Sequence, residues 1–268
     1  MPKVRAGQIE LEVVRRGVGM PVLLVHGFPL DHSMWHTQIE LLSSRWQVIA
    51  PDLRGFGGSQ ALGGAATMEQ MADDLAAILD ELGVDEPVVF CGLSMGGYVG
   101  FQFWRKHRAR LRALVLCDTR AIADTPEGAA GRLKLAETVL RDGTVSLADG
   151  MLPKLFAPAT IEREKEMVES QWSKILAASP GGVAAALRGM AARESAVDYL
   201  PQISVPTLVV VGSEDAISTP DEMREIAAAI PGSEFVVIPH SGHMTPLENP
   251  AAFNTAIERF LARVESGS

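Results

Sequence analysis

The chain alternates between short apolar runs and longer stretches whose apolar residues have helical spacing. Apolar runs rich in Val, Ile and Leu recur at 21–27, 46–52, 87–92, 112–118, 206–212 and 233–239. Their hydrophobicity is continuous, which is typical of parallel strands that helices cover on both faces. An earlier segment, 8–17, alternates apolar and polar positions instead. We therefore expect it to be an antiparallel edge strand or one arm of a hairpin.

Helix signals fall between these runs. A helix over 66–83 is predicted to begin at a capping box formed by Thr67 and Gln70 and to end at Gly83. Two later helices are predicted to begin with an N-cap residue followed by a proline, at Thr219–Pro220 and Asn249–Pro250. Strands that alternate with helices predict an α/β fold, with a doubly wound and mostly parallel sheet.

One long region departs from this alternation. Between about 120 and 200 no segment has the pattern of a strand, and apolar residues recur at helical spacing. We expect a helical cap inserted between two strands, lying over the carboxyl edge of the sheet. The predicted division is a core of 1–119 and 201–268 with a cap of 120–200.

Composition narrows the classes of function. The 268 residues carry 24 Lys and Arg against 33 Asp and Glu, a net charge of −9, and no dense basic run, so we expect no nucleic-acid partner. No apolar stretch approaches the roughly 18 residues of a membrane span, and the start lacks a secretory signal, so we expect a cytoplasmic protein without membrane contact. The two cysteines, Cys91 and Cys117, are predicted to be buried free thiols rather than a bridge between neighbouring strands.

The candidate nucleophile is Ser94, in the stretch VVFCGLSMGGYVGF at 88–101. It stands between a buried strand and a helix, with Gly92 and Gly96 two positions away on either side. This is the nucleophile elbow, a strained turn that exposes the serine hydroxyl where strand and helix backbones pass close together. A glycine-rich phosphate loop is the alternative, but the spacing of a dinucleotide fingerprint is missing.

A serine needs a base to take its proton. His243 follows the last predicted strand, where a loop can bring an imidazole back over the sheet edge. His240 is the rival, because it is still close to the strand end. His26 belongs to the first buried strand and is expected to be a structural hydrogen-bonding residue. Three further histidines are expected in loops or on the surface: His32, His36 and His107.

The base needs an acid that orients its ring. Asp215 follows the penultimate strand by a short loop, which gives the chain order serine, aspartate, histidine. Adjacent Glu214 could compete, and Asp118 is a second rival because the strand after the nucleophile can also supply this acid.

Two backbone amides are expected to bind the developing oxyanion. Met95 N–H directly follows the nucleophile, and Phe28 N–H follows Gly27 in the loop after the first central strand.

With HGFP, DLRGFGGS, GLSMGG, SEDAISTP and SGHMTPLENP in this order, the chain resembles the α/β-hydrolases over essentially its whole length. It is similar to their compact carboxylesterase, enol-lactonase and cofactor-free perhydrolase branch. The resemblance implies an acyl-enzyme on Ser94 and helices at 120–200 that cover the pocket, with no cofactor and no metal. Haloalkane dehalogenases and epoxide hydrolases place aspartate where Ser94 stands, so those chemistries are disfavoured.

The substrate follows less directly from the sequence. Apolar residues of the cap suggest neutral esters of small to medium size in a hydrophobic pocket. The residues expected to line that pocket are Leu30, Met151, Leu155, Phe156, Trp172, Ile217 and Met244. The interpretation is a serine carboxylesterase, acting as a monomer or small homo-oligomer on a small-molecule ester or lactone.

Two alternatives stay open. A lactonase of the 3-oxoadipate enol-lactonase type would need a cation for its carboxylate-bearing substrate, which Arg120 or Arg132 could supply. A perhydrolase side activity belongs to the same alternative. A non-catalytic ligand receptor is the alternative from a different class of function.

Overall fold

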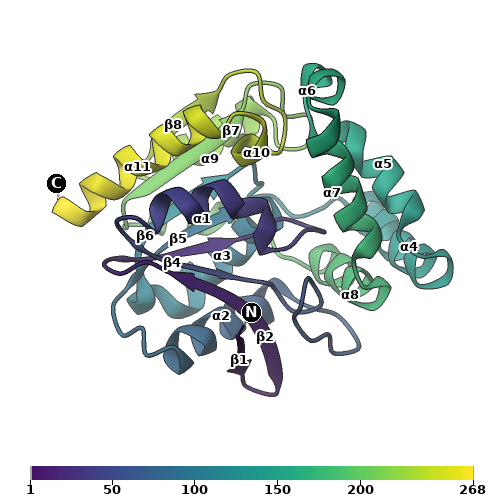
Figure 1. Cartoon of the computed structure of the whole chain (residues 1–268), viewed down its shortest axis with the longest axis horizontal. Helices are drawn as coiled ribbons and strands as arrows, with labels where there is room; N and C mark the ends of the chain where they lie inside the picture. Colours follow the sequence, from purple (N-terminus) through teal and green to yellow (C-terminus); the bar gives the residue numbers. More distant parts are fainter. Residues whose placement is uncertain (1, 268) are drawn as a thin grey trace.

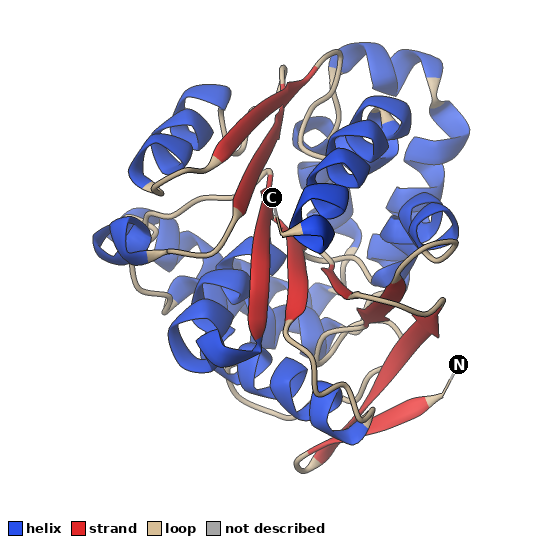
Figure 2. Cartoon of the chain, turned by 90° about the vertical axis from the view of Figure 1, so that its left-hand side faces the viewer, coloured by secondary structure: helices blue, strands red, loops and turns tan. Residues whose placement is uncertain are grey.

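The computed structural model describes residues 2–267, and its strands form a single mixed sheet (Figures 1 and 2). Along the sheet the order is β1-β2-β4-β3-β5-β6-β7-β8. The strands are β1 Lys3–Ala6, β2 Ile9–Arg16, β3 Pro21–Val25, β4 Gln47–Pro51, β5 Val88–Leu93, β6 Leu111–Cys117, β7 Thr207–Gly212 and β8 Glu234–Ile238. All six predicted apolar runs are strands, which confirms the expected α/β class.

Strand direction divides the sheet into two parts. The six strands from β3 to β8 are parallel to one another, whereas β2 is antiparallel to both β1 and β4. The alternating segment is therefore a hairpin arm, as one of the two expectations had it. It is not the edge, because β1 pairs with its outer side.

Helices cover both faces of the sheet. In Figure 1, α1 and α11 lie on one face and the pair α2 and α3 on the other. The helices of the core are α1 His36–Leu42, α2 Met68–Glu81, α3 Met95–His107, α9 Pro220–Ala229, α10 Thr245–Glu248 and α11 Pro250–Ser266, with short 3₁₀ turns at His32–Trp35, Arg108–Arg110 and Val197–Gln202. Thr67 and Thr219 both form capping boxes, and Asn249 caps α11, as predicted. In residues 2–267, no helix is long and apolar enough to cross a membrane.

Five helices gather beside the carboxyl ends of the parallel strands (Figure 1). They are α4 Pro126–Asp142, α5 Val145–Leu155, α6 Pro158–Arg163, α7 Lys165–Ala177 and α8 Pro180–Ala191. The backbone of α8 comes close to two core loops, because a Cβ at Gly182 would run into Gly55, and one at Gly189 would run into Ala66. The last residue of α5, Leu155, also accepts a hydrogen bond from the backbone of His243. All described helices and strands between β6 and the 3₁₀ turn at Val197–Gln202 are helices, as the sequence predicts. The division into core and cap domains stays a prediction.

The two cysteines lie on neighbouring strands. Cys91 on β5 and Cys117 on β6 are both free and buried, with their sulfur atoms 3.8 Å apart. Burial and the neighbouring thiol raise the pKa of Cys117 well above its usual range, so this thiol is an inert core group at neutral pH. The expectation of buried free thiols is confirmed.

Candidate active site

Ser94 occupies a strained turn between β5 and α3. Its φ of 55° lies in the left-handed region, which non-glycine residues rarely adopt. The turn is tight on both sides, because a Cβ at Gly92 would run into the Gly96 carbonyl and one at Gly96 would run into the Val25 carbonyl. Glycines are therefore required around the serine by contact with neighbouring backbone, as the elbow interpretation expects.

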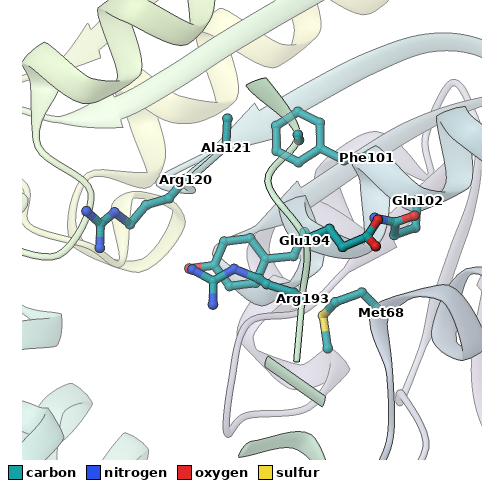
Figure 3. Close-up of a pocket in the computed structure, with 9 residues that line it drawn as sticks. Met68, Phe101, Gln102, Arg120, Ala121, Arg193 and Glu194 are labelled. Carbon is teal, nitrogen blue, oxygen red and sulfur yellow. The ribbon is translucent and has the colours of Figure 1, made fainter. Parts of the chain in front are cut away.

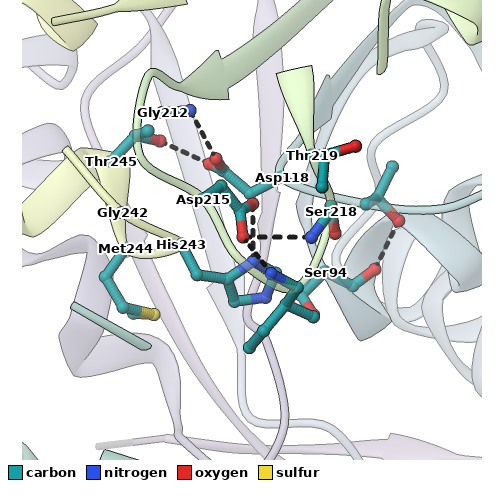
Figure 4. Close-up of polar contacts among 12 residues, drawn as sticks. Ser94, Asp118, Gly212, Asp215, Ser218, Thr219, Gly242, His243, Met244 and Thr245 are labelled. Atoms are coloured by element: carbon teal, nitrogen blue, oxygen red, sulfur yellow. Dashed lines mark hydrogen bonds and ion pairs between the residues drawn. The ribbon is translucent and has the colours of Figure 1, made fainter. Parts of the chain in front are cut away.

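His243 and Asp215 form a buried pair on two adjacent loops (Figure 4). The Nδ1 atom of His243 lies 2.8 Å from Oδ2 of Asp215, and the two residues are 2% and 3% exposed. The other carboxylate oxygen of Asp215 accepts the backbone N–H groups of Ile217 and Ser218, at 2.7 and 3.0 Å. Because a carboxylate only accepts, Nδ1 carries the proton and Nε2 is left as the basic atom.

The three rival residues lie elsewhere or have other partners. His240 is exposed, and its backbone N–H donates to Ser213 Oγ. Glu214 is exposed as well. Asp118 is completely buried, but its oxygens contact the Gly212 N–H and the Thr245 hydroxyl. The geometry therefore favours Asp215 and His243 over these alternatives.

The two amides expected to bind an oxyanion are buried near the serine. Phe28 follows β3 and is 8% exposed, and Met95 is the first residue of α3 and is 0% exposed. Among residues 2–267, neither backbone N–H has an acceptor in the protein. Buried amides without a partner are rare, so a pair of them beside a serine is suited to binding a developing negative charge.

A cavity of about 470 Å³ contains both Ser94 and His243 in its wall. Apolar side chains from the helical insertion and from the core make up most of the remaining wall: Phe28, Leu135, Leu147, Met151, Leu187, Met190 and Ile217. Only Met151 and Ile217 of the seven residues expected in the pocket line this cavity. Within the described chain, the other five are not among its lining residues: Leu30, Leu155, Phe156, Trp172 and Met244.

These five residues have other surroundings. Leu155, Phe156 and Met244 are buried in the hydrophobic core, and the Leu155 carbonyl accepts the backbone N–H of His243 at 3.0 Å. Leu30 lines a separate cavity. The indole N–H of Trp172 on α7 donates to the carboxylate of Asp149 on α5. Helical periodicity shows which residues are apolar, but it does not show which of them face a cavity.

Three cationic side chains also line the cavity: Arg120, Arg132 and Lys154. Arg120 pairs with Glu222 and Arg132 with Asp124, each at 2.5 Å. Lys154 is exposed, and no ion pair involves it among the described residues. No Asp or Glu lines the cavity among residues 2–267, so the ammonium group of Lys154 is the positive charge in its wall that an acidic partner does not neutralise.

A much smaller cavity shares Arg120 and Tyr98 with the first in its wall, and Figure 3 shows Arg120 among its lining residues. Its volume is about 10 Å³, enough for roughly one water molecule, and its wall includes Gln102 and Arg193. The Oε1 atom of Gln102 has no partner in residues 2–267, which suits an ordered water. This cavity is too small for a substrate.

A second histidine–aspartate pair was not predicted. Nδ1 of His32 lies 2.6 Å from Oδ1 of Asp52, which also accepts the His32 backbone N–H, and Oδ2 of Asp52 accepts Gly58 N–H. Burial disfavours the charged form of His32, but the hydrogen bond and charge of Asp52 prevail and raise its pKa. Burial likewise opposes ionisation of Asp52, and its bonds to His32 and Gly58 nonetheless lower its pKa. The sequence offered one signal for this pair, an aspartate directly after the predicted strand that became β4.

His26, which directly follows β3, has the structural hydrogen-bonding role that was expected of it. His26 is completely buried, its Nε2 accepts Leu53 N–H, and its Nδ1 lies 3.0 Å from the Gly27 carbonyl. Burial lowers the pKa of His26, so the neutral ring joins two loops at the carboxyl edge.

Asp31, His32 and Asp52 bring ligand atoms within 4.8 Å of one another, the spacing of a metal site. Their atoms are already engaged, because His32 Nδ1 contacts Asp52 and Asp31 Oδ1 caps the Ser33 N–H. These atoms therefore already form hydrogen bonds that hold the loops, which disfavours a metal ion at this position.

The fold agrees with comparison to known proteins. Residues 20–250 match the family described as alpha/beta hydrolase fold, and the chain belongs to that family. It is similar to a thermophilic esterase from Thermogutta terrifontis whose structure was determined with malate bound, with 50% identity, a TM-score of 0.96 and 98% coverage of each chain.

Enol-lactonases are also among its relatives. The solved enol-lactonase from Burkholderia xenovorans is 31% identical, with a TM-score of 0.91, covering 97% of this chain and 100% of the other. The 3-oxoadipate enol-lactonase 2 of Acinetobacter baylyi is 29% identical over 231 residues, 86% of this chain and 84% of the relative.

Proposed function

We propose that this protein is a serine carboxylesterase that hydrolyses small to medium neutral esters through an acyl-enzyme on Ser94. The observation that carries the proposal is one cavity containing Ser94 and His243, with Asp215 bound to the far side of the imidazole. Relatives named as esterase and enol-lactonase support the same class of bond.

The reaction would proceed in two steps. The Ser94 hydroxyl oxygen attacks the ester carbonyl carbon while His243 Nε2 takes its proton, and that proton then passes to the departing alcohol. The imidazole next takes a proton from water, whose oxygen attacks the acyl carbon. The bond between that carbon and the Ser94 oxygen then breaks, and the imidazolium returns its proton to this oxygen, which releases the acid and free Ser94. Asp215 holds the ring with Nδ1 protonated and stabilises the imidazolium formed in each step.

The oxyanion of each tetrahedral intermediate would accept the N–H groups of Phe28 and Met95. Each such donor contributes roughly 3 kcal/mol to transition-state stabilisation in other hydrolases. The amide of Met95 belongs to the first turn of α3, so the positive end of that helix dipole acts in the same direction.

The cavity supports a modest apolar acyl group. About 470 Å³ is within the range for small-ligand sites, and more than half of the lining residues are apolar. We expect short acyl chains to fit between the helical insertion and the elbow, and long ones to exceed the available space.

A second candidate, a lactonase for carboxylate-bearing lactones, is favoured by the cationic side chains in the cavity wall. Arg120 and Arg132 have acidic partners, whereas Lys154 remains free to meet a substrate carboxylate.

The first experiment measures initial rates on p-nitrophenyl esters from acetate to palmitate, with Ser94→Ala alongside. We expect a maximum at short chains and a loss of at least about 10⁴-fold in the variant, whose melting temperature should match the wild type. Substantial esterase activity in Ser94→Ala would disprove the nucleophile. A single stoichiometric acylation without turnover would favour the receptor function.

The second experiment separates the two substrate classes. Turnover of a neutral and an anionic lactone is compared in the wild type, in Lys154→Met and in Lys165→Met, an exposed lysine outside the cavity wall. A lactonase with an anion site should lose about 10-fold in kcat/KM for the anionic lactone only in Lys154→Met. Equal rates in all three proteins would leave the neutral esterase as the proposed function.

A further inference from the structure

Asp118 lies at a corner where three functional loops meet. It directly follows β6, is completely buried and has a φ of 46°, in the left-handed region. Its Oδ1 accepts the Gly212 N–H at 2.9 Å, and its Oδ2 lies 2.5 Å from Thr245 Oγ1 (Figure 4). One side chain thus contacts two different segments of the chain.

Both segments lead into the proposed catalytic groups. Gly212 ends β7, three residues before Asp215, and Thr245 begins α10, two residues after His243. The next residue of the corner, Thr119, donates its hydroxyl to the backbone carbonyl of Ser94 at 2.7 Å. The two-residue corner Asp118–Thr119 therefore contacts the serine turn, the acid loop and the histidine loop together.

This corner is destabilising for the fold. A left-handed φ outside glycine is strained, although aspartate tolerates it better than most residues. Burial, with the nearby charge of Asp215 and a smaller effect of Glu248, raises the pKa of Asp118 well above its usual range, against the bonds from Thr245 and Gly212. Such a group is expected where its hydrogen bonds fix a geometry that matters.

We propose that Asp118, through Thr245 and Gly212, is a positioning residue that sets the Asp215–His243 pair in register with Ser94. The inference rests on the proposed function of Ser94, Asp215 and His243. We call the contacts of Asp118 with Gly212 and Thr245 the clasp. Within the described chain neither Asp118 nor Thr245 lines the substrate cavity, so the clasp acts on the orientation of the imidazole and not on substrate binding. Its loss should lower kcat and leave KM nearly unchanged.

The test uses matched hydroxyl variants. Thr245→Val removes the partner of Asp118 at constant shape, and Thr245→Ser keeps the hydroxyl. Thr207→Val is the control, because Thr207 is 2% exposed at the opposite end of β7 and donates only to the Val205 carbonyl. On a short p-nitrophenyl ester, we expect kcat to fall about 10-fold or more in Thr245→Val, with KM within 3-fold. Thr245→Ser and Thr207→Val should stay within about 3-fold of the wild-type kcat.

A double-mutant cycle adds a readout that general destabilisation would not reproduce. If Asp118 and Thr245 act through each other, Asp118→Gly, which tolerates the left-handed φ and removes both oxygens, combined with Thr245→Val should lower kcat no further than the more damaging single change. Additive losses, or a Thr245→Val kcat equal to that of Thr207→Val, would overturn the proposal. If Thr245→Val fails to fold, the kcat and KM of Asp118→Gly decide by the same criteria.

Failure of this inference is distinguishable from failure of the proposed function. An active Ser94→Ala would disprove the serine mechanism whatever the Thr245 variants do. An inactive Ser94→Ala beside a fully active Thr245→Val would disprove only the clasp. Labelling with a fluorophosphonate counts the functional serines in each sample, so that kcat is expressed per competent site.

Discussion

Two histidine–aspartate pairs at the carboxyl edge of this sheet have similar local chemistry and different surroundings. His243 Nδ1 lies 2.8 Å from Asp215, and His32 Nδ1 lies 2.6 Å from Asp52. The first histidine lines the same cavity as Ser94. The second does not line that cavity in the described chain, and its aspartate also accepts the His32 and Gly58 backbone N–H groups. A hydrogen-bonded histidine and aspartate therefore do not by themselves indicate catalysis.

The loops that each pair joins explain the difference. One oxygen of Asp215 accepts backbone N–H groups of its own loop, and the other contacts Nδ1 of His243. Because Nδ1 is the atom that faces the carboxylate, Nε2 is left as the basic atom. Asp52 uses both oxygens to join the segment after β3 to the turn after β4. We interpret the second pair as a support for the loop that carries the Phe28 amide.

The largest expected contrast comes from removing each histidine. His243→Ala should lower kcat on a short ester by about 10⁴-fold or more, because the serine loses its base. His32→Ala should lower kcat by about 10-fold or less, through a displaced Phe28 amide. Steady-state kinetics on folded samples, checked by melting temperature, measure both. Comparable losses in the two variants would refute the assigned roles.

The two aspartates should separate catalysis from stability. Asp215→Asn is expected to lower kcat by about 10⁴-fold, because the amide favours the wrong imidazole tautomer. Asp52→Asn is expected to lower the free energy of unfolding by about 2 kcal/mol, since one amide cannot replace a carboxylate that accepts three N–H groups. Kinetics and urea unfolding on both variants provide the measurements. An Asp52→Asn protein with normal stability would contradict the support role.

A smaller effect follows from the raised pKa of His32 and the lowered pKa of Asp52. Histidine with a raised folded pKa stabilises fully below its unfolded value of about 6.5, and this is lost as pH rises through the folded pKa. Aspartate with a lowered pKa stabilises above about 3.9, and this is lost as pH falls through its folded pKa. Wild type should therefore exceed His32→Gln in melting temperature most clearly between about pH 4 and 6.5.

Thermal melts of wild type and His32→Gln across that pH range check this prediction. Because the His32 side chain keeps some contact with solvent, with 15% of its surface exposed, we expect about 1 kcal/mol, or roughly 2–4 °C, at the maximum. A difference that grows steadily toward alkaline pH would contradict the charged pair.

The smallest effect is expected at His240. This residue is three positions from His243, but it is exposed and has a φ of 55°. Asparagine tolerates that backbone, so His240→Asn should keep kcat, KM and melting temperature within experimental error. A large loss of kcat would revive His240 as the base.

Much of the fold could be predicted because its signals are local. The continuous apolar runs became β3 to β8, and the capping boxes at Thr67 and Thr219 begin helices where the residue types require them. The segment around Ser94 was equally informative, since only glycine fits where backbones pass close at Gly92 and Gly96. These features depend on neighbours in the sequence or on a strand-to-helix turn of fixed shape.

The pocket was harder to predict because its wall combines distant segments. Leu155, Phe156 and Met244 have the apolar character expected of a pocket, yet they are buried in the core. Leu147 and Leu187 instead line the cavity, and nothing in their local pattern distinguishes them from other cap leucines. Which side of a helix meets a cavity depends on how the helices pack.

By itself, the amino-acid sequence determined the α/β class, the turn at Ser94 and the order of candidate groups along the chain, because hydrophobic period and glycine spacing act over short distances. Only the tertiary structure decided that Asp52 binds His32, that Asp118 joins Gly212 to Thr245, and that Met151 and Ile217 face the cavity. These contacts join residues far apart in the chain, and packing of the whole sheet brings them within hydrogen-bond distance.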